Sequence, residues 1–144
     1  PQGRAIKALL DTTVVSGWIK PQANAGLTAW LTDAEEDALF LSVVTIAELK
    51  RGAERLPAGR RRKAIETWLH RDILLRFERR ILPVDVAMAE AWGRVTARCD
   101  DIGRPIGSMD AFIAAAAELY DLTLVTRNDS DFRPVVKMIV NPWS

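Results

Sequence analysis

Short apolar runs alternate with longer helical patterns along this chain, and this alternation constrains the fold more than any other feature. Strands are predicted where apolar and β-branched residues form short runs, at residues 6–10, 39–44, 81–84, 122–126 and 135–140. Between these runs, apolar residues recur every three or four positions, which places them on one face of a helix. This order predicts a three-layer α/β/α domain with a mainly parallel central sheet of four to five strands.

Helices are predicted over residues 14–19, 45–54, 85–102 and 108–119, around Leu27 to Leu31, and in a long segment after Gly59 where Ile65, Leu69, Ile73 and Phe77 repeat every four residues. Within 85–102 one stripe carries Met88, Trp92, Val95, Cys99 and Ile102. Together with the segment from Trp18 to Trp30, this stripe offers more apolar surface than a thin sheet covers. Surplus apolar surface predicts a protein interface.

Length, composition and charge limit the classes of protein to which this chain can belong. A chain of 144 residues, 49% hydrophobic and 27% charged, suits one globular domain over residues 1–144. The net charge of +1 does not by itself indicate a nucleic-acid partner. The longest uninterrupted apolar run, 111–117, is far shorter than the roughly 20 residues of a membrane span, so no membrane association is predicted. A single cysteine, Cys99, suits a reducing compartment, and we expect a cytoplasmic protein.

Acidic residues stand where predicted strands end or the following helices begin. Asp11 follows the first strand, Glu48 lies in the helix after the second, and Asp110 lies in the first turn of the Ala-rich helix. Asp129 and Asp131 follow the fourth strand. In a parallel sheet these junctions meet at one edge. Carboxylates gathered there repel one another unless a hard divalent cation such as Mg²⁺ or Mn²⁺ binds them.

Each acid also has a structural explanation. Asp11 could cap a helix, and Thr45-x-x-Glu48 matches a capping box. Asp110 would interact favourably with a helix dipole, and the other two acids lie in a turn, where Asp is common. Capping residues have no reason to converge on one edge, whereas a two-metal hydrolase requires several carboxylates from separate elements. The joint pattern therefore predicts a metal-dependent phosphodiesterase.

The sequence lacks the residues that other catalytic mechanisms would need. The only histidine, His70, lies in a basic helix and Cys99 in an apolar stripe, which disfavours zinc ligation and Cys/His or Ser/His/Asp catalysis. A phosphatase of the haloacid-dehalogenase kind needs a second acid where Thr13 stands. A non-catalytic nucleic-acid-binding subunit stays an alternative, and so does a nuclease that acts on DNA, since the bond attacked is the same.

Five segments resemble the PIN-domain ribonucleases, specifically the VapC/FitB-type toxins of toxin–antitoxin pairs: LLDTTVVS (9–16), TIAELKRG (45–52), PIGSMDAFIAA (105–115), VTRNDSDF (125–132) and NPW (141–143). They cover essentially the whole chain in the same order. The resemblance implies an α/β/α fold, Mg²⁺ or Mn²⁺ dependence and endonucleolytic cleavage of RNA. It also implies homodimerisation and inhibition by a small cognate antitoxin protein.

Carried over by motif, Asp11, Glu48 and Asp110 are the three central catalytic and metal-binding acids. Family members often carry a fourth acid at or just beyond the position of Asn128, and here Asp129 and Asp131 both qualify. We favour Asp129 as the fourth catalytic acid, with Asp131 in the turn or the outer part of the metal site. The hydroxyls of Thr12 and Thr126 could add to the site or serve in turns and caps.

A basic segment could attract RNA. Residues 60–80 hold eight Lys or Arg and three acids, and we predict that Arg61, Arg62 and Lys63 bind RNA phosphates without reading sequence. The alternative is a solvated helix face. The five tryptophans could stack on unpaired bases, but Trp30, Trp68 and Trp92 lie on apolar stripes, and we expect those three in the core.

Overall fold

Five parallel strands form the centre of the computed structural model, which describes residues 6–144. The strands are β1 (Ala8–Leu10), β2 (Leu39–Ser42), β3 (Ile81–Leu82), β4 (Thr123–Val125) and β5 (Ile139–Val140). Their order in the sheet is β3-β2-β1-β4-β5, and every neighbouring pair is parallel. Residues 1–5, which the predicted domain includes, lie outside the described residues.

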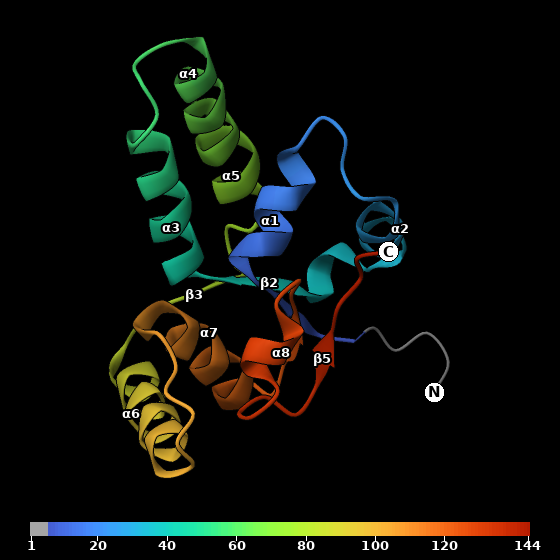
Figure 1. Ribbon diagram of the computed structural model, residues 1–144. Helices are drawn as coiled ribbons and strands as arrows, with labels where there is room; N and C mark the ends of the chain where they lie inside the picture. Colours follow the sequence, from blue (N-terminus) through green and yellow to red (C-terminus); the bar gives the residue numbers. More distant parts are fainter. Residues whose placement is uncertain (1–5) are drawn as a thin grey trace.

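Helices connect the strands (Figure 1). α1 (Thr12–Ile19), α2 (Ala25–Asp33) and the short 3₁₀ helix η1 (Glu36–Ala38) lead from β1 to β2. α3 (Val43–Glu54), α4 (Arg60–Thr67), the π-helical turn η2 (Trp68–Ile73) and α5 (Leu74–Arg76) lead to β3. α6 (Val86–Asp101) and α7 (Ser108–Leu119) precede β4, and α8 (Asp129–Phe132) precedes β5. In the part of the chain described, no helix is long and apolar enough to cross a membrane.

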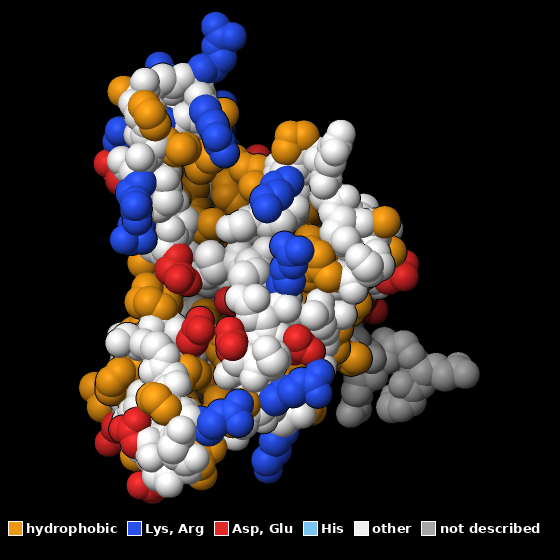
Figure 2. All heavy atoms as spheres, viewed as in Figure 1, with side chains coloured by type: hydrophobic (Ala, Val, Ile, Leu, Met, Phe, Trp, Pro, Cys, Tyr) orange, Lys and Arg blue, Asp and Glu red, His pale blue; other side chains and the backbone are white. Residues whose placement is uncertain are grey.

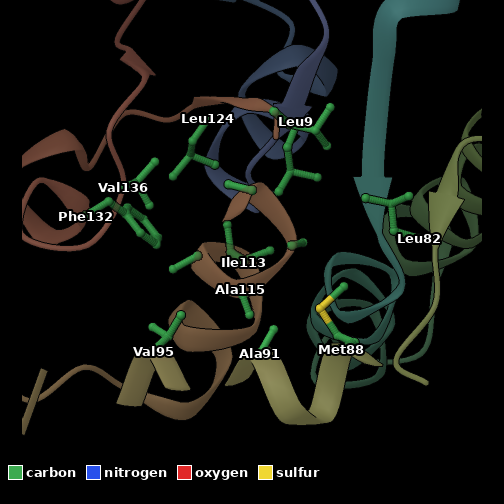
Figure 3. Packing of buried hydrophobic residues seen from close by; sticks show 14 of the residues in the cluster. Leu9, Leu82, Met88, Ala91, Val95, Ile113, Ala115, Leu124, Phe132 and Val136 are labelled. Atoms are coloured by element: carbon green, nitrogen blue, oxygen red, sulfur yellow. The ribbon is translucent and has the colours of Figure 1, made fainter. Parts of the chain in front are cut away.

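Alternation along the strands divides the core between the two faces of the sheet. Leu9 of β1 belongs to a cluster with α6 and α7, whereas Ala8 and Leu10 belong to a second cluster with α1, α2 and η2. Figure 3 shows the first cluster, in which Leu9 and Leu124 lie above the side chains of α7. The sheet thus has helices on both faces, and the predicted three-layer α/β/α fold is confirmed (Figure 1).

The strands are shorter than predicted, and for β2 the reason is that a helix begins immediately after it. The predicted strand at residues 39–44 ends at Ser42, whose Oγ accepts a hydrogen bond of 3.0 Å from the backbone N–H of Val44. This cap starts α3 two residues before the predicted helix, so Val43 and Val44 are helical. The predicted strand at 135–140 is likewise reduced to its last two residues.

The predicted apolar stripe in 85–102 lies in the core. Met88, Val95 and Cys99 are buried under α7, and Trp92 packs partly buried beside them. Only Ile102, beyond the end of α6, is exposed. The prediction that this stripe forms an interface is therefore wrong, because α6 and α7 form a hairpin that covers it. Trp30 and Trp68 pack partly buried against the other cluster, so the three tryptophans expected in the core lie at its border.

The C-terminal segment is held against the start of α2. Asn24 caps α2 by accepting hydrogen bonds from the N–H groups of Gly26 (2.9 Å) and Leu27 (3.2 Å), and its Oδ1 also accepts one from the N–H of Ser144 (3.1 Å). A Cβ at Gly26 would lie 2.3 Å from the carbonyl oxygen of Pro142. The two segments therefore meet at backbone distance, which only glycine permits.

Gly26→Ala is expected to displace this segment and to lower the free energy of unfolding by about 1–3 kcal/mol, the usual cost of overpacking. Urea unfolding measures the change. Gly93→Ala on α6 is the matched control, because a Cβ there meets no atom within 4 Å and alanine favours the helix. Equal stability of the Gly26→Ala variant and the wild type would show that the segment is not packed in this way.

Candidate active site

Asp11 lies where β1 ends, beside the end of β4. These two neighbouring strands are the point where the chain changes direction across the sheet, the usual position of a site in such folds. Asp11 is 4% exposed. Its Oδ1 accepts a hydrogen bond from the N–H of Thr12 (2.7 Å), and its Oδ2 accepts one each from the hydroxyls of Thr126 (2.7 Å) and Thr13 (3.1 Å). Asp11 is thus a helix cap and a carboxylate held at the sheet edge.

Glu48 points to the same edge from the second turn of α3. Because Ser42 caps this helix, Thr45 and Glu48 do not form the capping box that their spacing suggested. Glu48 Oε1 instead accepts a hydrogen bond of 2.6 Å from the hydroxyl of Thr12. The Thr12 hydroxyl also lies 3.0 Å from the hydroxyl oxygen of Thr45, which is fully buried. These contacts connect Glu48 to the residue that follows Asp11.

Asp110 faces the other acids from the first turn of α7. Burial raises the pKa of its carboxyl, and the negative charges of Asp11, Glu48 and Asp131 raise it further. This effect requires Asp11, Glu48 and Asp131 each to lie near Asp110, although the four residues come from four separate segments. Figure 2 shows acidic side chains gathered in the middle of one face of the molecule, between the two helical layers. We call Asp11, Glu48, Asp110 and Asp131 the acidic cluster.

Asp129 and Asp131 lie in different surroundings, although both are in α8. Asp129 Oδ2 forms an ion pair of 2.8 Å with Arg133, and Asn141 Nδ2 lies 3.4 Å from Asp129 Oδ1. The hydrogen bond from Arg133 lowers the pKa of Asp129 against a smaller effect of burial, and the bond from Asn141 lowers it further. Asp131 instead contributes negative charge at Asp110. Asp131 also lines one cavity together with Asp110, and Asp129 does not, so we group Asp131, rather than the favoured Asp129, with the three central acids.

The donor set of the acidic cluster suits a hard cation. In residues 6–144, no three His, Cys, Asp or Glu side chains are positioned to hold one metal ion directly. Mg²⁺, however, keeps several of its waters and binds through one or two carboxylates, so it does not require three converged ligands. All four donors are oxygen ligands, and their repulsion at Asp110 is what a divalent cation would relieve. These residues therefore fit a hydrated Mg²⁺ or Mn²⁺.

The predicted RNA-binding residues Arg61, Arg62 and Lys63 lie far from the cluster. They are in the first turn of α4, at the outer end of the arm that α3 and α4 form, away from the sheet edge where β1 ends and Asp11 follows (Figure 1). Arg62 forms ion pairs with Glu54 (2.7 Å) and Glu66 (3.7 Å), which partly neutralise its charge. Their binding of RNA stays a prediction, and the structure does not bring them to the site.

A family profile described as PIN domain matches residues 8–137. The chain belongs to the PIN-domain family. This PIN domain is 34% identical to Toxin FitB of Neisseria gonorrhoeae over 135 residues. That match covers 94% of this chain and 97% of that protein. It is 33% identical to VapC ribonuclease Y4jK of Sinorhizobium fredii, with 94% and 96% covered. The crystal structure of FitAcB from Neisseria gonorrhoeae superposes with a TM-score of 0.88 at 34% identity, with 94% of this chain and 98% of that chain covered. Structural neighbours of this PIN domain are FitAB and VapBC toxin–antitoxin complexes.

Sequence reasoning found the acids of this PIN domain but overlooked two of the hydroxyls around them. It proposed Thr12 and Thr126 for the site, and both contact an acid of the cluster. It missed Thr13, which contacts Asp11, and Thr45, which lies against Thr12. Thr13 stands two residues after Asp11 at the end of the first strand, and this position could have identified it as a neighbour of the site. Thr45 was interpreted as a cap, because the start of α3 was placed two residues too late.

Proposed function

We propose that this protein is a metal-dependent endoribonuclease, the toxin of a type II toxin–antitoxin pair, and that it hydrolyses RNA phosphodiester bonds. The observation that carries the proposal is the convergence of four carboxylates at one sheet edge, where three of them raise the pKa of Asp110. The family supports it, since a relative of similar length is named as a VapC ribonuclease. We also expect the protein to act in the cytoplasm.

Asp11, Glu48, Asp110 and Asp131 are the residues that would hold Mg²⁺ or Mn²⁺. When bound, such a cation polarises the phosphate and lowers the pKa of the attacking water. The protein orients these carboxylates through hydrogen bonds. The hydroxyls of Thr126 and Thr13 donate to Asp11, and the hydroxyl of Thr12 donates to Glu48. Hydrogen-bonded carboxylates keep their orientation when substrate arrives, and such supporting contacts to metal ligands contribute about 10- to 100-fold to metal affinity or activity.

The ends of the RNA products test the proposed function. With water as the nucleophile, the P–O3′ bond breaks, so products are expected to carry 5′-phosphate and 3′-hydroxyl ends and the 2′-OH takes no part in the attack. Single-stranded RNA is incubated with the protein and Mg²⁺ or Mn²⁺, and the ends are read by mass spectrometry. Finding 2′,3′-cyclic phosphate ends would sink this mechanism. Cleavage of DNA but not RNA would assign the site to DNA instead.

Two protein partners complete the proposal: a second copy of this chain and a cognate antitoxin. An exposed apolar surface lies just after the ends of β2 and β3, the two strands at one side of the sheet. It consists of Val43, Val84 and Val86, of which Val86 is 77% exposed. Such an apolar surface suits a homodimer interface. The relatives in toxin–antitoxin complexes support an antitoxin partner, and a basic side chain of that partner could neutralise the acidic cluster.

Light scattering tests the homodimer directly. The protein alone is expected to have about twice the 16.0 kDa mass of one chain at micromolar concentration. Val86→Asp should shift it towards the monomer, because the change places a charge in the apolar surface. Glu90→Gln, on an exposed part of the same helix, serves as the control. A wild-type protein of 16.0 kDa would refute the homodimer.

A further inference from the structure

A cavity of about 620 Å³ lies directly beside the acidic cluster. It shares Thr12 and Thr13 with the surroundings of Asp11 and Glu48, so it continues the site along the sheet edge. The proposed function leaves it unused. Its volume is within the range of roughly 300–1,000 Å³ that small-molecule sites occupy. Besides the two threonines, it is lined by Ser16, Gly17, Lys20, Gln22, Ala23, Asn24, Leu27, Arg127, Asn128 and Trp143.

The chemistry of the lining suits an anion attached to a flat ring. Lys20 and Arg127 are both exposed, neither forms an ion pair within residues 6–144, and the lining contains no carboxylate. Arg127 Cζ lies 5.5 Å from the centre of the Trp143 ring. The cavity thus combines free positive charge with a planar guanidinium that lies within cation–π distance of an indole.

Arg127 and Trp143 are both held at this cavity. A Cβ at Gly17 would lie 3.0 Å from Trp143 Cζ2, so the indole packs closely against the backbone of α1. Asn141 Nδ2 donates a hydrogen bond of 3.2 Å to the carbonyl oxygen of Arg127, and the N–H of Arg127 donates one of 3.2 Å to the hydroxyl of Thr13. Thr13 in turn donates to Asp11. The backbone of Arg127 and the indole of Trp143 are therefore fixed relative to the acidic cluster.

We propose that this cavity binds one nucleotide of single-stranded RNA next to the phosphate that is cleaved. The unpaired base stacks on the guanidinium of Arg127, which Trp143 supports, and Lys20 neutralises the phosphate of the same nucleotide. A paired base is already stacked in its duplex, so the cavity selects single strands. The identification of the nucleic acid as RNA, and of the acidic cluster as the cleavage site, rests on the proposed function.

Binding rather than cleavage tests this inference. The probe is a fluorescein-labelled, 12-nucleotide single-stranded RNA of mixed sequence, and its Kd is measured by anisotropy with Mg²⁺ in an Asp11→Asn background. We expect Lys20→Gln to weaken binding about fivefold at low salt and to reduce the slope of log K against log salt by about 0.7, the loss of one phosphate contact. Arg127→Lys should weaken binding about fivefold with no change of slope, because lysine keeps the positive charge but lacks the planar guanidinium on which the base stacks.

Lys137→Gln is the matched control, because this exposed lysine lies before the start of β5, at the other end of the strand from the cavity. It should change Kd less than twofold, and duplex RNA should be insensitive to Arg127→Lys. Equal Kd values for the cavity variants and the control would overturn the inference. If the wild type cleaves RNA but cavity variants bind normally, only the inference fails. If cavity variants lose binding but the wild type does not cleave, only the proposed function fails.

Discussion

Asp11→Asn is expected to lower the rate of RNA cleavage by more than about 100-fold while the protein stays folded. Residues that merely support metal ligands contribute about 10- to 100-fold, and a carboxylate that binds the cation should contribute more. Asn keeps the cap, because its Oδ1 can accept from the N–H of Thr12, and its Nδ2 can donate to the hydroxyl of Thr126. The free energy of unfolding should therefore fall by less than about 1 kcal/mol.

Asp110→Asn should abolish cleavage in the same way but should not destabilise the metal-free protein. A carboxyl whose pKa is raised on folding, as burial and the neighbouring acids raise that of Asp110, stabilises the fold fully only below its ordinary value of 3.8. This stability is lost as pH rises through the folded pKa, so at pH 7 the ionised group weakens the fold. We expect the melting temperature of metal-free Asp110→Asn to equal or exceed that of the wild type at pH 7, and the difference to shrink towards pH 4.

Asp85→Asn is the matched control for these two variants. Asp85 also caps a helix after a strand, since its Oδ1 accepts a hydrogen bond of 3.0 Å from the N–H of Met88, but it is not among the charges that act on Asp110. Cleavage by this variant should stay within twofold of the wild type. If Asp11→Asn unfolded the protein yet cleaved normally per folded molecule, Asp11 would be a cap and nothing more.

Asp131→Asn is expected to lower cleavage by at least about 10-fold, whereas Asp129→Asn should lower it less than threefold. Asp131 contributes negative charge at Asp110, where a cation would bind. Asp129 is neutralised by Arg133, 2.8 Å away, and held by Asn141. Outer ligands of a metal contribute about 10- to 100-fold, whereas removal of an exposed ion pair costs little. Cleavage rates at saturating Mg²⁺ compare the two variants.

Arg133→Gln separates the two acids further, because it frees Asp129 without changing its carboxylate. If Asp129 only pairs with Arg133, this variant should cleave at the wild-type rate. A large loss in Asp129→Asn together with normal activity in Asp131→Asn would restore Asp129, the acid that the family pattern favours, as the fourth member of the site.

Sequence alone located the three central acids because Asp11 and Glu48 follow strands that apolar runs identify, and Asp110 lies in the first turn of the helix that leads into β4. Parallel strands share one carboxyl edge, so Asp11, Glu48 and Asp110 had to meet once the sheet was predicted. The fourth acid could not be chosen from the sequence. Its environment depends on Asn141, twelve residues further along, which contacts Asp129 only because the chain returns beside the site after β5.

Two other features could not be predicted from short sequence patterns either. The stripe on α6 has the composition of an interface, and only the hairpin with α7 shows that it is core. The long helical segment after Gly59 buries Leu69, Ile73 and Phe77 as their spacing predicts. The π-helical turn over Trp68–Ile73 is not predictable from that spacing, because a single wide turn leaves the apolar positions on the same side.

The central claim, that the acidic cluster cleaves RNA with a divalent cation, is tested most directly by one titration. Single-stranded RNA is incubated with wild-type and Asp11→Asn protein while Mg²⁺ or Mn²⁺ is added after complete removal of metal by a chelator. The account predicts no cleavage without metal, cleavage by the wild type that rises and saturates with the cation, and at least about 100-fold less by Asp11→Asn. Equal cleavage by both proteins, or wild-type cleavage that persists in the chelator, would contradict it.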